Sequence, residues 1–225
     1  MDNILLIETS TALCSVALAQ DGAVTSYRES SAPKAHASLT AVFIQEMLAE
    51  RGLTLADCDA ICVSKGPGSY TGLRVGVSTA KGLCFGSGKP LLAVGTLDTL
   101  VAQADEIGGI KYIIPMIDAR RMEVYTAVFE NGVQITETSP MIIDETSFAE
   151  YLEQGPCLFI GDGAGKCADV IKHPNAQFCQ CWPKASAMLV PAMAAYKEKR
   201  FEDVAYFEPF YLKEFVATVS KKNLW

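Results

Sequence analysis

A glycine-rich segment between two apolar stretches has the residue types that can bind a phosphate. It reads KGPGSYTG over residues 65–72, between a predicted strand, 60–64, and a predicted helix, 70–85. Backbone N–H groups at a helix start can bind an anion. A Walker loop would place a lysine and a hydroxyl residue directly after its last glycine, where Leu73 and Arg74 stand. A dinucleotide fingerprint requires a spacing one residue shorter. The alternative is a tight turn that uses the freedom of glycine at positive φ.

Histidines and cysteines are the other candidates, because they can bind metals. Cys179 and Cys181 form the tightest pair, with His173 nearby, but no second pair at zinc-ligand spacing exists among the eight cysteines. A metallopeptidase needs paired histidines with a glutamate base, and neither His36 nor His173 has such neighbours. We therefore expect no metal and no cofactor. Most cysteines lie in apolar stretches, where a thiol behaves as a small hydrophobe, so we expect them to be reduced.

The composition limits the function classes. The chain has 225 residues, of which half are hydrophobic, and this length allows one large or two small domains. Its net charge is −7, and it lacks the concentrated basic surface with which an isolated nucleic-acid binder neutralises phosphates. A partner would therefore supply most contact with a nucleic acid. The first apolar run follows no basic region and stops at Glu8, so it resembles neither a signal peptide nor a membrane span. We therefore expect a cytoplasmic protein.

The elements that position these residues follow from hydrophobic periodicity. Three short runs, 3–10, 13–20 and 23–29, predict strands, and Asp21-Gly22 between the last two is a strong hairpin signal. Helical spacing over 36–51 and 70–85, with buried strands at 60–64 and 91–94, completes the order βββαβαβ. This order is the arrangement of the ribonuclease-H-like lobe of actin-like ATPases.

The second half begins again with strands. We predict strands at 112–117, 123–129 and 157–160, and helices near 147–153 and 185–199. This pattern predicts an abbreviated second lobe. The boundary is expected within residues 103–109, where the glycines at 108–109 break the pattern. We therefore predict an N-terminal lobe of residues 1–104 and a smaller C-terminal lobe of residues 105–225.

Small residues recur every four positions in the predicted helix 70–85. Glycine inside a helix costs about 1 kcal/mol relative to alanine, so Gly72 and Gly76, with Ala80, need a compensating reason. Such a row lets another backbone approach closely. The neighbour would be a helix of another chain or, alternatively, an element of the same lobe.

Four segments together resemble the bacterial TsaB (YeaZ) family over nearly the whole chain. They are IETS at residues 7–10, GPGSYTGLRVGVSTAKG at 66–82, DARRMEVY at 118–125 and EPFYLK at 208–213. The resemblance implies an actin-like ATPase fold with two lobes. It also implies a subunit of the complex that installs N6-threonylcarbamoyladenosine next to the anticodon of tRNAs reading codons that begin with A.

The resemblance further implies a role without catalysis. The family stabilises its catalytic paralogue TsaD and helps to recruit the ATPase TsaE, it forms a homodimer when alone, and it meets tRNA through the complex. The paralogue carries His-x3-His, whereas this chain has only His36, followed by Thr40 four residues later. The expected partner interface consists of residues on the helices 36–51 and 70–85, namely Leu39, Val42, Phe43, Tyr70, Gly72, Leu73, Gly76, Thr79 and Ala80.

A nucleotide site between the lobes is expected to be vestigial. The family's usual aspartate is replaced by Glu8, whose extra methylene would displace a metal-water contact. Thr9, Ser10 and Asp118 would line the same cleft. In the alternative of an actin-like small-molecule kinase these residues would act with the loop 161–165, which otherwise serves as a flexible turn. A metallopeptidase is the other alternative.

Overall fold

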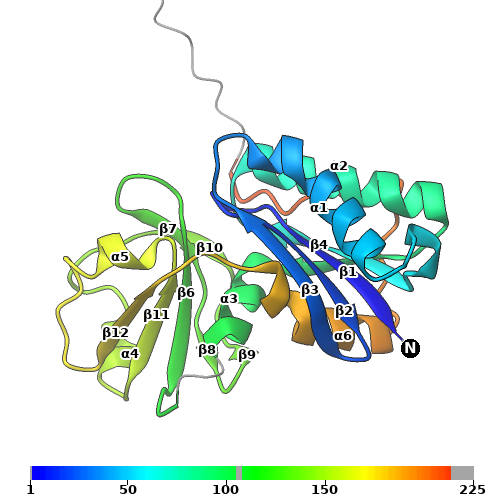
Figure 1. The fold of residues 1–225 in the computed structure, drawn as a ribbon. Coiled ribbons are helices and arrows are strands. Elements are labelled where there is room, and N and C mark those ends of the chain that lie inside the picture. Colours follow the sequence, from blue (N-terminus) through cyan, green and yellow to red (C-terminus); the bar gives the residue numbers. More distant parts are fainter. Residues whose placement is uncertain (1, 105–107, 214–225) are drawn as a thin grey trace, which may run out of the picture.

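The first lobe contains a five-stranded sheet with the strand order β3-β2-β1-β4-β5. The structure is a computed structural model that describes residues 2–104 and 108–213. Helices α1 and α2 lie side by side on one face of this sheet (Figure 1). The elements are β1 (Asn3–Glu8), β2 (Cys14–Gln20), β3 (Ala23–Ser30), α1 (Ala35–Glu50), η1 (Leu55–Asp57), β4 (Ala60–Gly66), α2 (Tyr70–Ser87) and β5 (Leu91–Gly95).

The hairpin between β2 and β3 turns where Asp-Gly predicts it. Asp21 and Gly22 have φ of 51° and 79°, the left-handed pair that a two-residue hairpin turn needs. β1 pairs antiparallel with β2 and parallel with β4. All six residues of β1 are buried, because helices pack on both faces of the sheet. The predicted order βββαβαβ is confirmed.

The second lobe repeats this arrangement around a sheet with the order β10-β7-β6-β11-β12, to which β8 and β9 are added beside β6. β6 pairs antiparallel with β7 and parallel with β11, as β1 does with β2 and β4. Its helices α4 and α5 have only four residues each, which confirms an abbreviated lobe. The elements are β6 (Tyr112–Asp118), β7 (Glu123–Thr126), β8 (Phe129–Glu130), β9 (Val133–Gln134), β10 (Ser139–Ile142), α4 (Ala149–Leu152), β11 (Cys157–Gly161), α5 (Ala164–Cys167) and β12 (Ala176–Gln180).

Helix α3 (Thr96–Ala104) lies between the two lobes (Figure 1). Its buried residues Leu97, Leu100, Val101 and Ala104 pack against Phe129 and other residues of the second sheet. This helix was not predicted, although its apolar residues have helical spacing.

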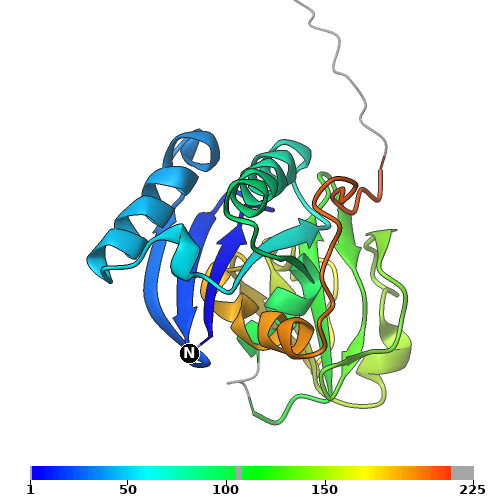
Figure 2. The ribbon, with the colours of Figure 1, turned by 90° about the vertical axis from the view of Figure 1, so that its right-hand side faces the viewer.

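The chain returns to the first lobe after β12. Here η2 (Ala185–Met188) and α6 (Leu189–Lys197) cover the face of the first sheet that α1 and α2 leave open (Figure 2). Ala192 packs with Ile4 and Leu6 of β1 in one buried cluster. The predicted assignment of residues 105–225 to the second lobe is therefore wrong from Ala185 onward in the described chain. Residues 105–107, at the predicted boundary, and 214–225 lie outside the described residues.

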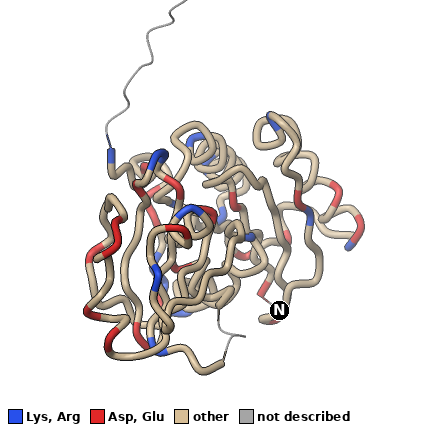
Figure 3. Tube along the Cα trace, turned by 90° about the vertical axis from the view of Figure 1, so that its left-hand side faces the viewer, with Lys and Arg blue, Asp and Glu red and all other residues tan. Residues whose placement is uncertain are grey.

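The described chain has neither a membrane-spanning helix nor, in the view of Figure 3, a concentrated basic region. Within the described ranges, no helix has the length and apolar character needed to cross a membrane. Lys and Arg positions are scattered among Asp and Glu positions in the view of Figure 3.

Candidate functional site: the interlobe cleft and the outer helices

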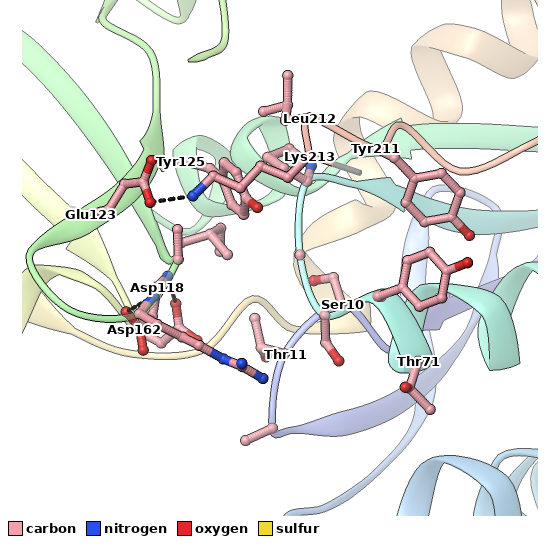
Figure 4. A pocket seen from close by; sticks show the side chains of 18 of the residues that line it. Ser10, Thr11, Thr71, Asp118, Glu123, Tyr125, Asp162, Tyr211, Leu212 and Lys213 are labelled. Carbon is pink, nitrogen blue, oxygen red and sulfur yellow. Dashed lines mark hydrogen bonds and ion pairs between the residues drawn. The ribbon is translucent and has the colours of Figure 1, made fainter. Parts of the chain in front are cut away.

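A cleft of about 890 Å³ opens between the lobes. It is lined by the β1–β2 turn, His36 at the start of α1, the loop before α2, the β6–β7 turn, the 161–165 loop and the last described residues of the chain (Figure 4). The predicted residues Ser10 and Asp118 both lie in its wall, one from each lobe. Asp162, from the 161–165 loop, lies beside Asp118 and lines the cleft as well.

The predicted residues Glu8 and Thr9 lie behind this wall. Both are fully buried, and neither lines the cleft. Oε1 of Glu8 accepts a hydrogen bond of 2.6 Å from the backbone N–H of Ser10, and burial raises the pKa of Glu8 to about 7. The carboxyl group thus braces the β1–β2 turn instead of facing a ligand.

Several buried polar atoms at this turn lack a hydrogen-bond partner among the described residues. They are Oε2 of Glu8, Oγ1 of Thr9, Oγ of Ser10 and Oγ1 of Thr11. A buried hydroxyl without a partner is costly unless water or another molecule satisfies it.

Asp118 is held by groups of its own lobe. It forms an ion pair with Lys166 on α5, and its backbone N–H donates to Oδ1 of Asp162 at 2.8 Å. Burial is the main cause that raises the pKa of Asp162 to about 6. Lys166 also donates to the carbonyls of Arg121 and Glu123, at 2.7 Å each. Asp118 is thus part of a bracing network at the β6–β7 turn.

The histidine considered for catalysis also has a structural partner. His36 lies in the first turn of α1, where Nε2 is 2.8 Å from the carbonyl oxygen of Thr11. Thr40, one turn later, is buried and donates to the carbonyl of His36.

Among the described residues, no three His, Cys, Asp or Glu side chains are grouped so as to hold a metal. Cys179 and Cys181 are partly buried. Burial is the main cause that raises the pKa of Cys181 to about 12, and the neighbouring Cys179 is the second cause.

The predicted role of the small-residue row in α2 is wrong. Gly72, Gly76 and Ala80 face the first sheet, and all three are buried. A Cβ on Gly72 would lie 2.1 Å from the carbonyl oxygen of Thr9, and one on Gly76 would lie 2.1 Å from Oγ1 of Thr9. These glycines let α2 approach the end of β1 in the same chain, and they make no room for another chain. Leu73 is buried beside them.

A second row of small residues lies on the opposite, exposed face of α2. Ser78, Gly82 and Gly86 also recur every four residues. A Cβ on Gly82 or Gly86 would have no described atom within 4 Å. Phe85 beside them is 87% exposed. This row has the same spacing as the inner row, so the sequence pattern alone did not distinguish the two.

The remaining predicted interface residues are divided by burial. Val42 is exposed, and Leu39, Tyr70 and Thr79 are partly exposed. Phe43 is partly buried and packs against the core of the first lobe. We call Leu39, Val42, Val75, Ser78, Thr79, Gly82, Phe85 and Gly86 the outer face of α1 and α2.

The loop before α2 has a local explanation. Gly66 has φ of 106°, and Gly68 passes so near the β1–β2 turn that a Cβ would lie 2.3 Å from the carbonyl oxygen of Ser10. Ser69 caps α2 by accepting from the backbone N–H of Gly72, and its own N–H donates to Ser10 at 2.6 Å. The turn alternative is thus confirmed for Gly66, and the approach to Ser10 explains Gly68.

The duplicated sheet order and the interlobe cleft define the class of the protein by its fold, a two-lobed fold of the actin-like ATPase type, as predicted. The family model described as "TsaD: tRNA N6-adenosine threonylcarbamoyltransferase" matches residues 29–221. The protein TsaB of Escherichia coli K12, named for tRNA threonylcarbamoyladenosine biosynthesis, is 33% identical over 222 residues, which cover 95% of this chain and 96% of that protein. The chain belongs to the TsaB (YeaZ) family.

Two further relatives agree with this assignment. TsaB of Haemophilus influenzae is 30% identical over 220 residues, 93% of each chain. The structure described as YeaZ from Pseudomonas aeruginosa has a TM-score of 0.81 and 28% identity, and the match covers 94% of this chain and 100% of that one.

Proposed function

We propose that this chain is a non-catalytic subunit of the machinery that forms threonylcarbamoyladenosine in tRNA. Its family membership supports the pathway, because the relatives are named for it. In this proposal the chain stabilises the catalytic paralogue TsaD, helps to recruit the ATPase TsaE, and works in the cytoplasm. It pairs with itself when TsaD is absent, and it meets tRNA through the complex.

The observation that supports the non-catalytic part is that three of the predicted reactive groups already have structural partners. His36 contacts the carbonyl of Thr11, Glu8 braces the β1–β2 turn, and Asp118 pairs with Lys166. A metal-assisted transfer needs ligands that converge on the ion and leave an open position, and among the described residues no three His, Cys, Asp or Glu side chains are grouped in this way. These groups are used to hold the cleft together.

The surface that supports pairing is the outer face of α1 and α2. Phe85 and Val42 are large apolar residues exposed by 87% and 42%. The neighbouring glycines would allow the backbone of a partner helix to approach closely. The same face would serve a second copy or TsaD, so the two pairings would exclude each other.

The experiment is a reconstituted reaction with the organism's own TsaD and TsaE, threonylcarbamoyl donor and tRNA. We expect modified adenosine only when this chain is included. Full modification without the chain would contradict the proposal. Metallopeptidase and kinase activities, which the relatives do not favour, are tested by assaying the purified chain alone for bound metal and for ATP binding.

A further inference from the structure

The segment 198–213, which we call the strap, runs from α6 along the first lobe (Figure 2). Its last four residues line the cleft. The strap is fixed to the first lobe by hydrogen bonds along its length. The N–H of Glu202 donates to the carbonyl of Leu91 at 2.9 Å, and the N–H of Phe210 donates to the carbonyl of Lys65 at 2.7 Å. Between them, Nζ of Lys81 donates to the carbonyls of two strap residues, at 3.1 and 2.9 Å. The strap is therefore a fixed part of the first lobe.

The end of the strap reaches across to the second lobe. The ring of Tyr211 packs on that of Tyr70 at the start of α2, with centroids 4.9 Å apart. Two residues later, Lys213 forms an ion pair with Glu123 and lies 5.8 Å from the ring centroid of Tyr125 (Figure 4). Both of these partners belong to β7. A contact between the lobes thus closes one side of the cleft.

The lobes are joined differently at α3. This helix packs against the second sheet, and the side chain of Gln103 near its end ties the segment by which the chain returns to the first lobe. Oε1 of Gln103 accepts from the N–H of Lys184 at 2.7 Å, and Nε2 donates to the carbonyl of Trp182 at 3.2 Å. A rotation of one lobe about α3 that keeps the contacts of Gln103 would separate Lys213 from Glu123.

We infer that the strap is an interlobe latch, in which the contact of Lys213 with Glu123 and Tyr125 holds the cleft closed. The side chains of Lys213 and Glu123 are 40% and 24% exposed. Ion pairs of this kind are weak and are screened by salt. Loss of this ion pair should therefore shift the balance between closed and open arrangements only a few-fold. This inference concerns the isolated chain and does not depend on the proposed pathway.

The test is the distance between the lobes, measured by pulsed electron paramagnetic resonance. Nitroxides are attached through a keto amino acid at the exposed positions Ser31 and Asp169, one in each lobe, which leaves the native cysteines unlabelled. Lys213→Ala and Glu123→Gln should each raise the fraction of long distances roughly two- to five-fold, the size expected for an exposed ion pair. The exchange of charges, Lys213→Glu with Glu123→Lys, should restore the native distribution.

Salt and a matched variant complete the design. About 1 M NaCl, where the Debye length is about 3 Å, should lengthen the distances in the native chain and have no further effect on Lys213→Ala. Arg200→Ala breaks an ion pair with Glu198 inside the strap and should leave the distances unchanged. An unaltered distribution in both latch variants, or a charge exchange that fails to restore it, would overturn the inference.

Discussion

The carbonyl oxygen of Thr9 lies 2.1 Å from the point that a Cβ on Gly72 would occupy. Glycine at this position therefore sets the distance between α2 and the end of β1. The helix packs so closely here that the turn beside Ser10 and the start of α2 form one wall of the cleft.

The same substitution at two glycines of α2 should have opposite effects. Alanine gains about 1 kcal/mol over glycine in a helix interior, and Gly82 offers open space for the methyl group. Gly82→Ala should therefore raise the free energy of unfolding by up to about 1 kcal/mol. Gly72→Ala should lower it by about 1 to 3 kcal/mol, because the backbone of Thr9 must move. Urea denaturation of both variants measures the difference, and equal changes in stability would refute the packing explanation.

A bulky residue on the outer face should block pairing without unfolding the chain. Gly82→Trp places a large side chain where a partner helix would approach, so we expect affinity for TsaD and for a second copy to fall about ten-fold or more. Val190→Trp is the matched control, because Val190 is 66% exposed on α6, at the other face of the sheet. Calorimetric titration with TsaD distinguishes the two variants. Undiminished affinity of folded Gly82→Trp would exclude this face as the interface.

Glu8 should make the stability of the chain depend on pH. Its pKa is about 7 in the folded protein and 4.5 in the reference state, so the folded protein holds the proton more tightly. The contribution of Glu8 to the free energy of unfolding is then greatest below pH 4.5, and it falls by up to about 3 kcal/mol as the pH rises through 7. Glu8→Gln removes the ionisable group and retains an acceptor for the N–H of Ser10. The variant should gain stability at pH 8 and change little at pH 4.5 in chemical denaturation. A gain that is equal at both pH values would show that Glu8 does not titrate in this range.

Local signals predicted the order of the elements well, because the turns and the periodicity carry it. Asp21 and Gly22 marked the hairpin, and apolar spacing gave both outer helices within two residues of their observed ends. β12 was missed because it has only five residues, none of them fully buried, and its apolar residues do not alternate regularly with polar ones. The strap was missed because it is held by backbone carbonyls, which leave no pattern in the side chains.

The site was predicted less well, because it depends on which face of a helix meets the sheet. The rows at Gly72 and at Ser78 have the same four-residue spacing, and only the packing against Thr9 separates inner from outer. Likewise, Glu8 and Ser10 are close in sequence, but one is sealed behind the wall that the other lines. Such distinctions depend on the tertiary packing.

We propose that this chain contributes no catalytic group to tRNA modification. The most direct test is the rate of threonylcarbamoyladenosine formation in the reconstituted reaction with His36→Gln, whose amide can still donate to the carbonyl of Thr11. We predict a rate within about two-fold of the native rate, because the variant keeps the support that His36 gives to the β1–β2 turn. A catalytic acid or base contributes about 10²- to 10⁴-fold. A fall of that size in a folded, assembled complex would contradict the claim.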